Sequence, residues 1–205
     1  MKHIATVSAV LVLALFAVGC QSGPTVGHPH PISVSRTPEP QWIHTLEPVG
    51  HDGYMFFVGR SVGAAMERSA VTDARQDVVD QVLEYLGGFA QRDFQARAVS
   101  FGLESAVLDP TSAGQQFRDF AYREYVRQNP PQDVYWEYRR TPGGDAYFAY
   151  VLQAVPVNRA MDTFAESKVE DAQERVRQAQ DVRAREQAQA YLEFWRDTQD
   201  AFGGE

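Results

Sequence analysis

A β-hairpin in the second half of the chain is the feature that most constrains the fold. Two stretches rich in aromatic and β-branched residues, 133–140 and 145–155, flank a Thr-Pro-Gly-Gly cluster at 141–144. This pattern predicts two antiparallel strands joined by a turn. Because side chains alternate along a strand, Val134, Trp136 and Tyr138 share one face, and Tyr135 lies on the other with Glu137 and Arg139.

The residues before the hairpin predict two helices and two more strands. An aromatic run bounded by glycines, 54–58, reads as a buried strand. Apolar residues recurring every four positions predict a helix from Ser61 to Leu86, stopped by Gly87 and Gly88. Alternation over 97–104 suggests another strand.

A second helix is predicted to begin at Asp109 and Pro110 and to end before Pro130. We therefore expect an α+β fold, in which a small, mostly antiparallel sheet of three to four strands packs with two helices. A long C-terminal α-helix completes the prediction.

That long helix rests on the residues from 158 to 205, where neither proline nor glycine occurs before Gly203 and Ala, Gln, Glu, Arg and Asp dominate. A weak, interrupted apolar seam runs along it, and its largest side chains are Val169, Val176, Leu192 and Trp195. Two alternatives follow. Either the distal part docks on a partner, or the helix bends back and its aromatic residues pack on the domain.

The N-terminus has the layout of a secretory signal. Lys2 precedes an apolar run over 4–18, which is shorter than the roughly 20 residues of a membrane span. Small residues, ending in Gly19, precede Cys20, the single cysteine. This box resembles the bacterial lipoprotein signal, which implies cleavage between Gly19 and Cys20 and lipidation of the Cys20 sulfur. By the same resemblance, Gln21 implies the outer membrane, facing the periplasm.

The stretch after the cysteine is rich in proline and reads as an extended tether. A metal ion shared by His28 and His30 lacks a third ligand, and a solvated stalk is the favoured interpretation. We expect four segments: a signal peptide at 1–19, the lipidated cysteine and tether at 20–48, an α+β domain at 49–157 and the long helix at 158–205.

Charge argues against nucleic acid as a partner. The chain carries 27 acidic and 19 basic residues, a net charge of -8. Such a surface repels a phosphate backbone. The expected partners are the membrane, through the lipid anchor, and a protein or a second copy, through the C-terminal helix.

The residue types needed for catalysis are sparse. All 5 histidines precede residue 52, and Cys20 is assigned to lipid. Lys168 adjoins Ser167 on a helix, where adjacent side chains diverge. The 59–63 segment, Gly-Arg-Ser-Val-Gly, lacks the ending of a nucleotide loop and reads as a packed turn. We therefore expect no enzyme activity, no catalytic residue, no metal and no cofactor.

Several short motifs together resemble a known family. They are the lipidated cysteine, Pro40-Gln41-Trp42, a strand ending in Phe57-Val58-Gly59, the Ala-rich helix, and the late hairpin followed by Val155-Pro156. The combination is similar to the twenty-kilodalton outer-membrane lipoprotein family and to the N-terminal domain of a flagellar outer-ring assembly protein. The resemblance covers about residues 40–160. It implies a small α+β domain exposed to the periplasm or cell surface, with no established catalytic residues.

Two functions are compatible with these features. The favoured one is a non-enzymatic envelope lipoprotein that scaffolds other proteins, in which case truncation after Arg159 leaves a folded domain. The alternative is a periplasmic module that binds glycan or peptide on the aromatic hairpin, with Tyr135 and Tyr147 as the platform.

Overall fold

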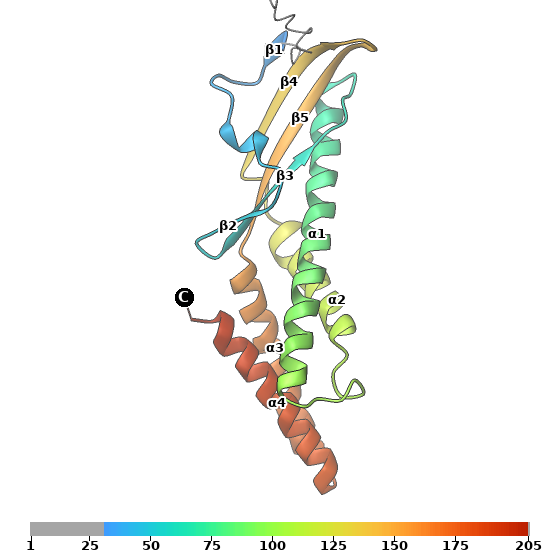
Figure 1. Cartoon of the computed structure of the whole chain (residues 1–205), viewed down its shortest axis with the longest axis vertical. Coiled ribbons are helices and arrows are strands. Elements are labelled where there is room, and N and C mark those ends of the chain that lie inside the picture. Colours follow the sequence, from blue (N-terminus) through green and yellow to red (C-terminus); the bar gives the residue numbers. More distant parts are fainter. Residues whose placement is uncertain (1–30, 205) are drawn as a thin grey trace, which may run out of the picture.

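The computed structural model describes residues 31–204 and confirms the α+β class (Figure 1). A 3-10 helix, η1, spans Gln41–His44, and a π-helix, η2, spans Tyr122–Val126. The strands are β1 (Ser33–Val34), β2 (Val49–His51), β3 (Tyr54–Arg60), β4 (Asp133–Thr141) and β5 (Gly144–Val155). The α-helices are α1 (Glu67–Ser100), α2 (Pro110–Ala121), α3 (Val157–Gln178) and α4 (Val182–Phe202).

The five strands form one antiparallel sheet in the order β1-β4-β5-β3-β2. The hairpin of β4 and β5 is confirmed, with Thr141 paired to Gly144 at its turn. Gly144 has a φ of 116°, a conformation that side chains other than glycine rarely adopt. The sheet has more strands than predicted because β1 and β2 lie at or beside the segment assigned to the tether.

Residues 35–48, which we call the strap, cross one face of the sheet. They must do so because β1 and β2 occupy opposite edges. Figure 1 shows the strap in blue on one side of the sheet and α1 along the other. Ile43 on the strap is only 4 % exposed. The prediction of a tether at 20–48 is therefore wrong for residues 31–48, which belong to the fold.

Helix α1 is longer than predicted and runs through Gly87 and Gly88. It buries one residue in every four: Ala70, Ala74, Val78, Val82, Leu86, Ala90, Phe94 and Ala98. Two interior glycines cost about 1 kcal/mol each relative to alanine, and packing on both sides of them offsets that cost. The strand predicted over 97–104 is wrong, because its first residues are the last turn of α1.

The beginnings of the first two helices differ in how they are capped. Helix α1 begins after Met66, which makes no side-chain cap, whereas Ser61 accepts a hydrogen bond from the Ala149 N–H at 2.8 Å. Asp109 caps α2 as predicted, accepting from the N–H groups of Thr111 and Ser112 at 3.1 and 3.2 Å. The Asp109 cap, which is local, was therefore predictable from the sequence. The hydrogen bond of Ser61 to the sheet was not.

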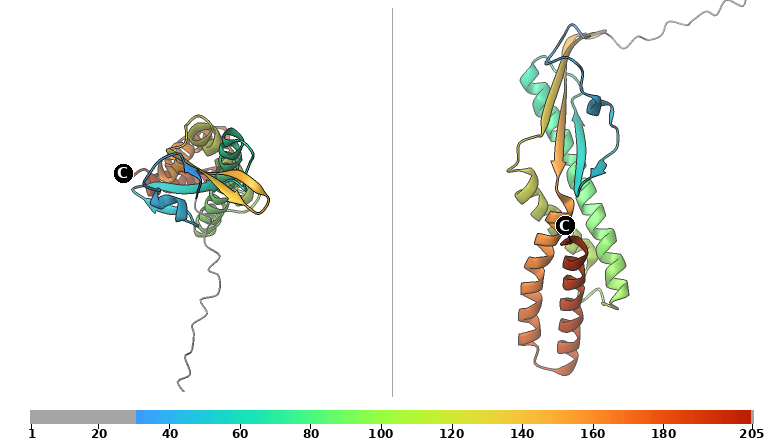
Figure 2. Two further views of the ribbon diagram at one scale, coloured as in Figure 1. Left: turned by 90° about the horizontal axis from the view of Figure 1, so that it is seen from above. Right: turned by 90° about the vertical axis from the view of Figure 1, so that its left-hand side faces the viewer.

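The long C-terminal helix is instead two antiparallel helices, α3 and α4, and the prediction of one helix is wrong (Figure 2). The chain breaks at 179–181, where the Asp181 carboxylate accepts from the Ala184 N–H at 2.7 Å and starts α4. The second of the two alternatives is confirmed, since α4 returns to the domain. The Phe94 ring on α1 lies 5.2 Å from Trp195 and 6.1 Å from Phe194.

Candidate functional site

The residues predicted for lipidation and cleavage, Cys20 and Gly19, lie outside the described residues. The other predicted site residues belong either to the hairpin or to the C-terminal helices. Their positions decide which surfaces are open to a partner.

Tyr135 is not an exposed platform. It is 1 % exposed, and its hydroxyl donates to Glu137 Oε1 at 3.2 Å. The strap lies over this face of the sheet, which explains the burial. The prediction of an open platform at Tyr135 is wrong.

Tyr147 lies on the opposite face of the sheet from Tyr135. It pairs across the hairpin with Tyr138, with ring centroids 4.6 Å apart, and its ring lies 5.7 Å from Trp136. Tyr147 is half-buried against the core. Since the two tyrosines occupy different faces, they do not form one binding platform.

A polar cluster fills the space between the sheet and the strap. Glu137 is 1 % exposed and forms an ion pair with Arg139, which also donates to the Tyr150 hydroxyl at 3.3 Å. Burial, together with the charge of Glu137, raises the pKa of Tyr135 to about 12. Burial also raises the pKa of Tyr150. Both hydroxyls therefore remain protonated and serve as structural hydrogen-bond groups near neutral pH.

Hydrogen bonds that involve four side chains hold the strap in place. Arg60 donates to the carbonyl oxygens of Ile43, at 3.2 Å, and Thr45. The Trp42 indole donates to Asp133 Oδ2 at 3.0 Å, and Arg36 donates to Asp133 Oδ1 at 2.9 Å. The hydrogen bond from Arg36 lowers the pKa of Asp133. The strap is thus attached by hydrogen bonds at several points.

The residues predicted as a partner-binding stripe pack within the molecule. Val169, Leu192 and Trp195 are 9 %, 5 % and 1 % exposed. Val176 is partly buried against the same core. The prediction that these side chains form an exposed docking stripe is wrong, because α3 and α4 bury them against each other and against α1.

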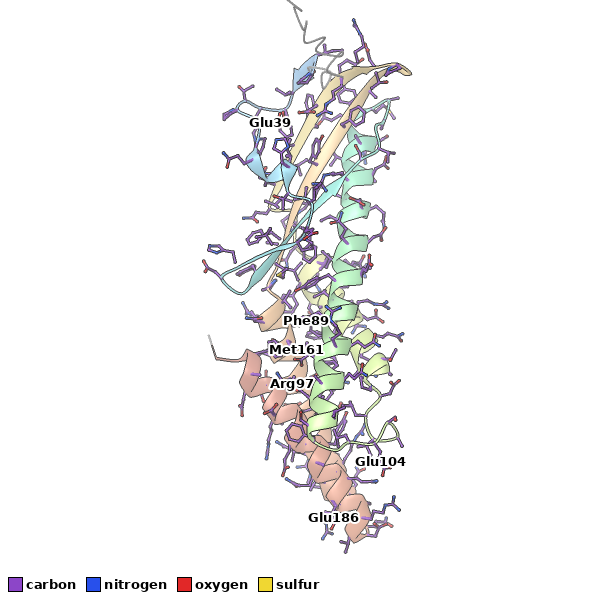
Figure 3. The ribbon with its side chains drawn as sticks, in the orientation of Figure 1. Glu39, Phe89, Arg97, Glu104, Met161 and Glu186 are labelled. Carbon is purple, nitrogen blue, oxygen red and sulfur yellow. The ribbon has the colours of Figure 1, made fainter. Side chains whose placement is uncertain are left out.

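The end of the helical hairpin is nevertheless open. We call residues 173–190 the tip, and none of them is buried. Figure 3 shows Glu186 at this end of the molecule and Glu39, on the strap, toward the other end. Val182, the first residue of α4, is 72 % exposed. The tip is therefore the part of the described chain that extends farthest from the sheet.

The tip is polar and nearly balanced in charge, unlike the acidic chain as a whole. Arg177 pairs with Glu174 at 2.6 Å, and the Arg175 guanidinium lies 4.4 Å from the Tyr191 ring centroid. The sequence signals for the tip were the interruption of the apolar seam at Arg183 and Glu186 and the helix-capping Asp181. These signals were present, but the turn between two helices was not predicted from them.

The groups considered for catalysis are engaged elsewhere. Lys168 donates to Gln116 Oε1 at 2.9 Å, and the Ser167 hydroxyl donates to the Phe164 carbonyl at 2.6 Å. The Arg60 N–H in the 59–63 segment donates to Asp77 Oδ2 at 2.8 Å. Helix α1 starts only at Glu67, so its N-terminus does not adjoin this loop.

Within residues 31–204, no three His, Cys, Asp or Glu side chains are grouped so as to hold a metal ion. The described helices include none with the length and hydropathy needed to cross a bilayer.

Comparison with known proteins adds no relative. No family model matches the chain. No curated protein and no solved structure matches it either.

Proposed function

We propose that the protein is a lipid-anchored lipoprotein of the cell envelope that assembles other envelope proteins without catalysing a reaction. In this proposal Cys20 carries the lipid, the outer membrane holds the anchor, and the domain faces the periplasm. The tip of the α3–α4 hairpin contacts the partner. The partner surface is thus moved from the buried apolar stripe to the exposed tip.

The observation that carries the proposal is that the start of the described chain and the tip lie at opposite ends of the molecule. The described chain begins beside β1 at one end, and the tip lies at the other (Figure 1). A chain anchored before residue 31 would hold the sheet nearer the membrane and present the tip away from it. The tip contains no buried residue, and Val176 is its one apolar side chain that packs partly against the core, so most of its surface is open to a partner.

The alternative function, glycan or peptide binding on the hairpin, depended on an exposed aromatic surface that the structure does not have there. Tyr135 lies under the strap, and Tyr147 packs on the other face. No observation of the hairpin faces therefore favours that function.

The anchor is tested by intact-mass analysis of protein extracted from membranes. We expect loss of residues 1–19 and added acyl mass on Cys20. A Cys20→Ser variant is expected to lose the acyl mass. A soluble wild-type product with a free thiol would contradict the proposal.

The tip is tested by replacing residues 173–190 with a Gly/Ser loop of about six residues, a usual length between antiparallel helices. Because none of the replaced residues is buried, we expect the domain to fold as before. Crosslinking in intact envelopes, with a photoreactive residue at position 182, is expected to capture a discrete partner.

The matched control places the photoreactive residue at Val62, which is 92 % exposed in the loop between β3 and α1. We expect the partner to be absent from this control, and from the tip replacement when the photoreactive residue stands in its Gly/Ser loop. Capture that is equal at positions 62 and 182 would overturn the assignment of the tip, whatever the result for the anchor.

A further inference from the structure

A cleft that the proposed function does not use lies between α1, β5 and the chain that leaves η2. Its volume is about 460 Å³, within the range of ligand sites. Arg75 on α1 and Arg127 after η2 line it, together with the amide side chains of Gln128, Asn129 and Gln153. Val78, Val79, Val126 and two prolines supply apolar walls.

The cleft has an unbalanced positive charge. None of its lining residues is a carboxylate. Within residues 31–204, neither Arg75 nor Arg127 forms an ion pair. The cleft therefore gathers two guanidinium groups and no carboxylate, although the chain as a whole has a net charge of -8.

The π-helix sets the position of one of the two arginines. The Arg127 N–H donates to the Tyr122 carbonyl at 2.8 Å, a bond that spans five residues. Such a turn holds one residue more than an α-helical turn, so it changes the direction of the residues that follow. Tyr122 itself lines the cleft. Interruptions of this kind are frequent at functional sites.

A second cleft adjoins the first. A neighbouring cleft of about 420 Å³ shares Asn129, Pro130 and Gln153 with the first. Arg159 and Glu124 line this second part. Gln153 is 4 % exposed, and its side-chain N–H donates to the Ala154 carbonyl at 3.3 Å. The two clefts meet at Asn129, Pro130 and Gln153, and we call the two together the groove. Arg75 and Arg127 line its first part, and Arg159 and Glu124 line its second.

We propose that this groove binds a short acidic peptide segment of another protein. Guanidinium groups bind carboxylates through paired, charge-assisted hydrogen bonds. The amide side chains offer both donors and acceptors, as the backbone of a peptide requires. The groove is longer than a single small anion needs. Residues 1–30 of the chain contain neither aspartate nor glutamate, so that part of the chain cannot supply the carboxylates.

The test is fluorescence anisotropy with the full folded chain and a labelled peptide of sequence Glu-Ala-Glu-Ala-Glu at low salt. We expect saturable binding that weakens roughly tenfold for each arginine replaced in Arg75→Gln and Arg127→Gln, since hydrogen bonds to charged groups are the strong ones. Arg183→Gln, at the tip, is the matched control and is expected to bind as the wild type does. Circular dichroism checks that each variant is folded, as expected for exposed side chains.

Three results would overturn the proposal. The first is binding of the uncharged Gln-Ala-Gln-Ala-Gln peptide with the same affinity as the acidic peptide. The others are a loss of affinity in Arg183→Gln as large as in the groove variants, and unchanged affinity in the Arg75→Gln, Arg127→Gln double variant. Displacement of the peptide by an equal concentration of inorganic phosphate would instead make the groove a small-anion site. The tip replacement leaves every lining residue of the groove in place, so failure here is distinguishable from failure of the tip assignment.

Discussion

At the scale of single residues, the strap converts an aromatic strand face into a buried polar cluster. Tyr135, Glu137 and Arg139 are consecutive residues on one face of β4, and each has a charged or hydroxyl partner there. A buried carboxylate is tolerated only when it is paired and hydrogen-bonded. The side chains of the cluster must therefore keep these partners, which fixes their positions between the sheet and the strap.

Tyr135 is expected to make the protein sensitive to alkali. Its pKa is about 12 in the folded chain against 10.0 for the ordinary group. The folded state therefore holds its proton more tightly, and this stabilisation is present below pH 10 and lost as the pH rises toward 12. Denaturant unfolding at several pH values is expected to show a shallower alkaline loss in Tyr135→Phe. Tyr54→Phe, at an exposed position, is the control, and an identical loss in both variants would contradict the assignment.

Gly59 marks the closest approach of the sheet to α1. A Cβ atom there would lie 2.0 Å from the Ala74 carbonyl oxygen and 2.7 Å from Val78 Cβ. Because a helix backbone cannot yield locally, we expect Gly59→Ala to lower the free energy of unfolding by about 3 kcal/mol. Gly143→Ala is the control, since its Cβ would meet only Thr141 Oγ1 at 3.8 Å. Equal stability of the two variants in urea would refute this reading.

At the scale of elements, the second half of α4 belongs to the core. Its Trp195 is 1 % exposed, with ring centroids 4.9 Å from Phe194 and 5.7 Å from Phe164. The apolar residues that suggested a partner thus find their contacts inside the same chain. Only the tip leaves the core.

Trp195→Ala is accordingly expected to destabilise the whole protein. Truncating a buried aromatic side chain typically costs about 3–5 kcal/mol. Thermal unfolding is the measurement, and Val182→Ala, at a position that is 72 % exposed, is expected to change stability by less than about 0.5 kcal/mol. A Trp195→Ala variant of unchanged stability that loses only self-association would restore the interface interpretation.

The strap is expected to loosen in acid. The hydrogen bond from Arg36 lowers the pKa of Asp133, whose ordinary value is 3.8. The contribution of this carboxylate is therefore present above pH 3.8 and is lost as the pH falls through the lower, folded value. We expect the NMR resonance of the Trp42 indole N–H to shift as the pH falls and Asp133 takes up a proton. This pH-dependent shift is expected to disappear in Asp133→Asn. Asp145→Asn, which removes an exposed pair with Arg140, is expected to leave the pH-dependent shift unchanged.

At the scale of the whole molecule, one continuous core joins the sheet to the α3–α4 hairpin. The cluster of buried residues runs from Phe57 on β3, along α1, to Trp195 on α4. Helix α1 is its common element, with the sheet on its first half and the other helices on its second (Figure 2).

Truncation after Arg159 is therefore expected to unfold the chain, contrary to the prediction from sequence. Removing α4 and most of α3 uncovers Phe94 and Phe117, both fully buried in the intact chain. Loss of the cooperative unfolding transition, followed by circular dichroism, is the expected result. The tip replacement is the control, because it keeps both rings covered. A truncated chain that unfolds cooperatively would show that the sheet and α1 are sufficient.

The elements that were predictable from the amino-acid sequence are those whose signals are local. The turn at 141–144, the Asp109 cap and the four-residue period that begins α1 each depend on neighbours within about one helical turn or one tight turn. The prediction that α1 ends at Gly87 was wrong because glycine only weakens a helix. Tertiary packing sets the length of α1.

Which faces are covered depends on contacts between distant parts of the chain. The Pro-rich segment became a strap because Arg60 and Asp133, distant in sequence, hold it, and that covering buried Tyr135. The seam of the C-terminal helices was read correctly as apolar, but a periodic seam does not identify what covers it. Here α1 and the return of α4 cover it, because burying apolar surface within the chain requires no second molecule. The groove with Arg75 and Arg127 likewise exists only after α1, η2 and β5 meet.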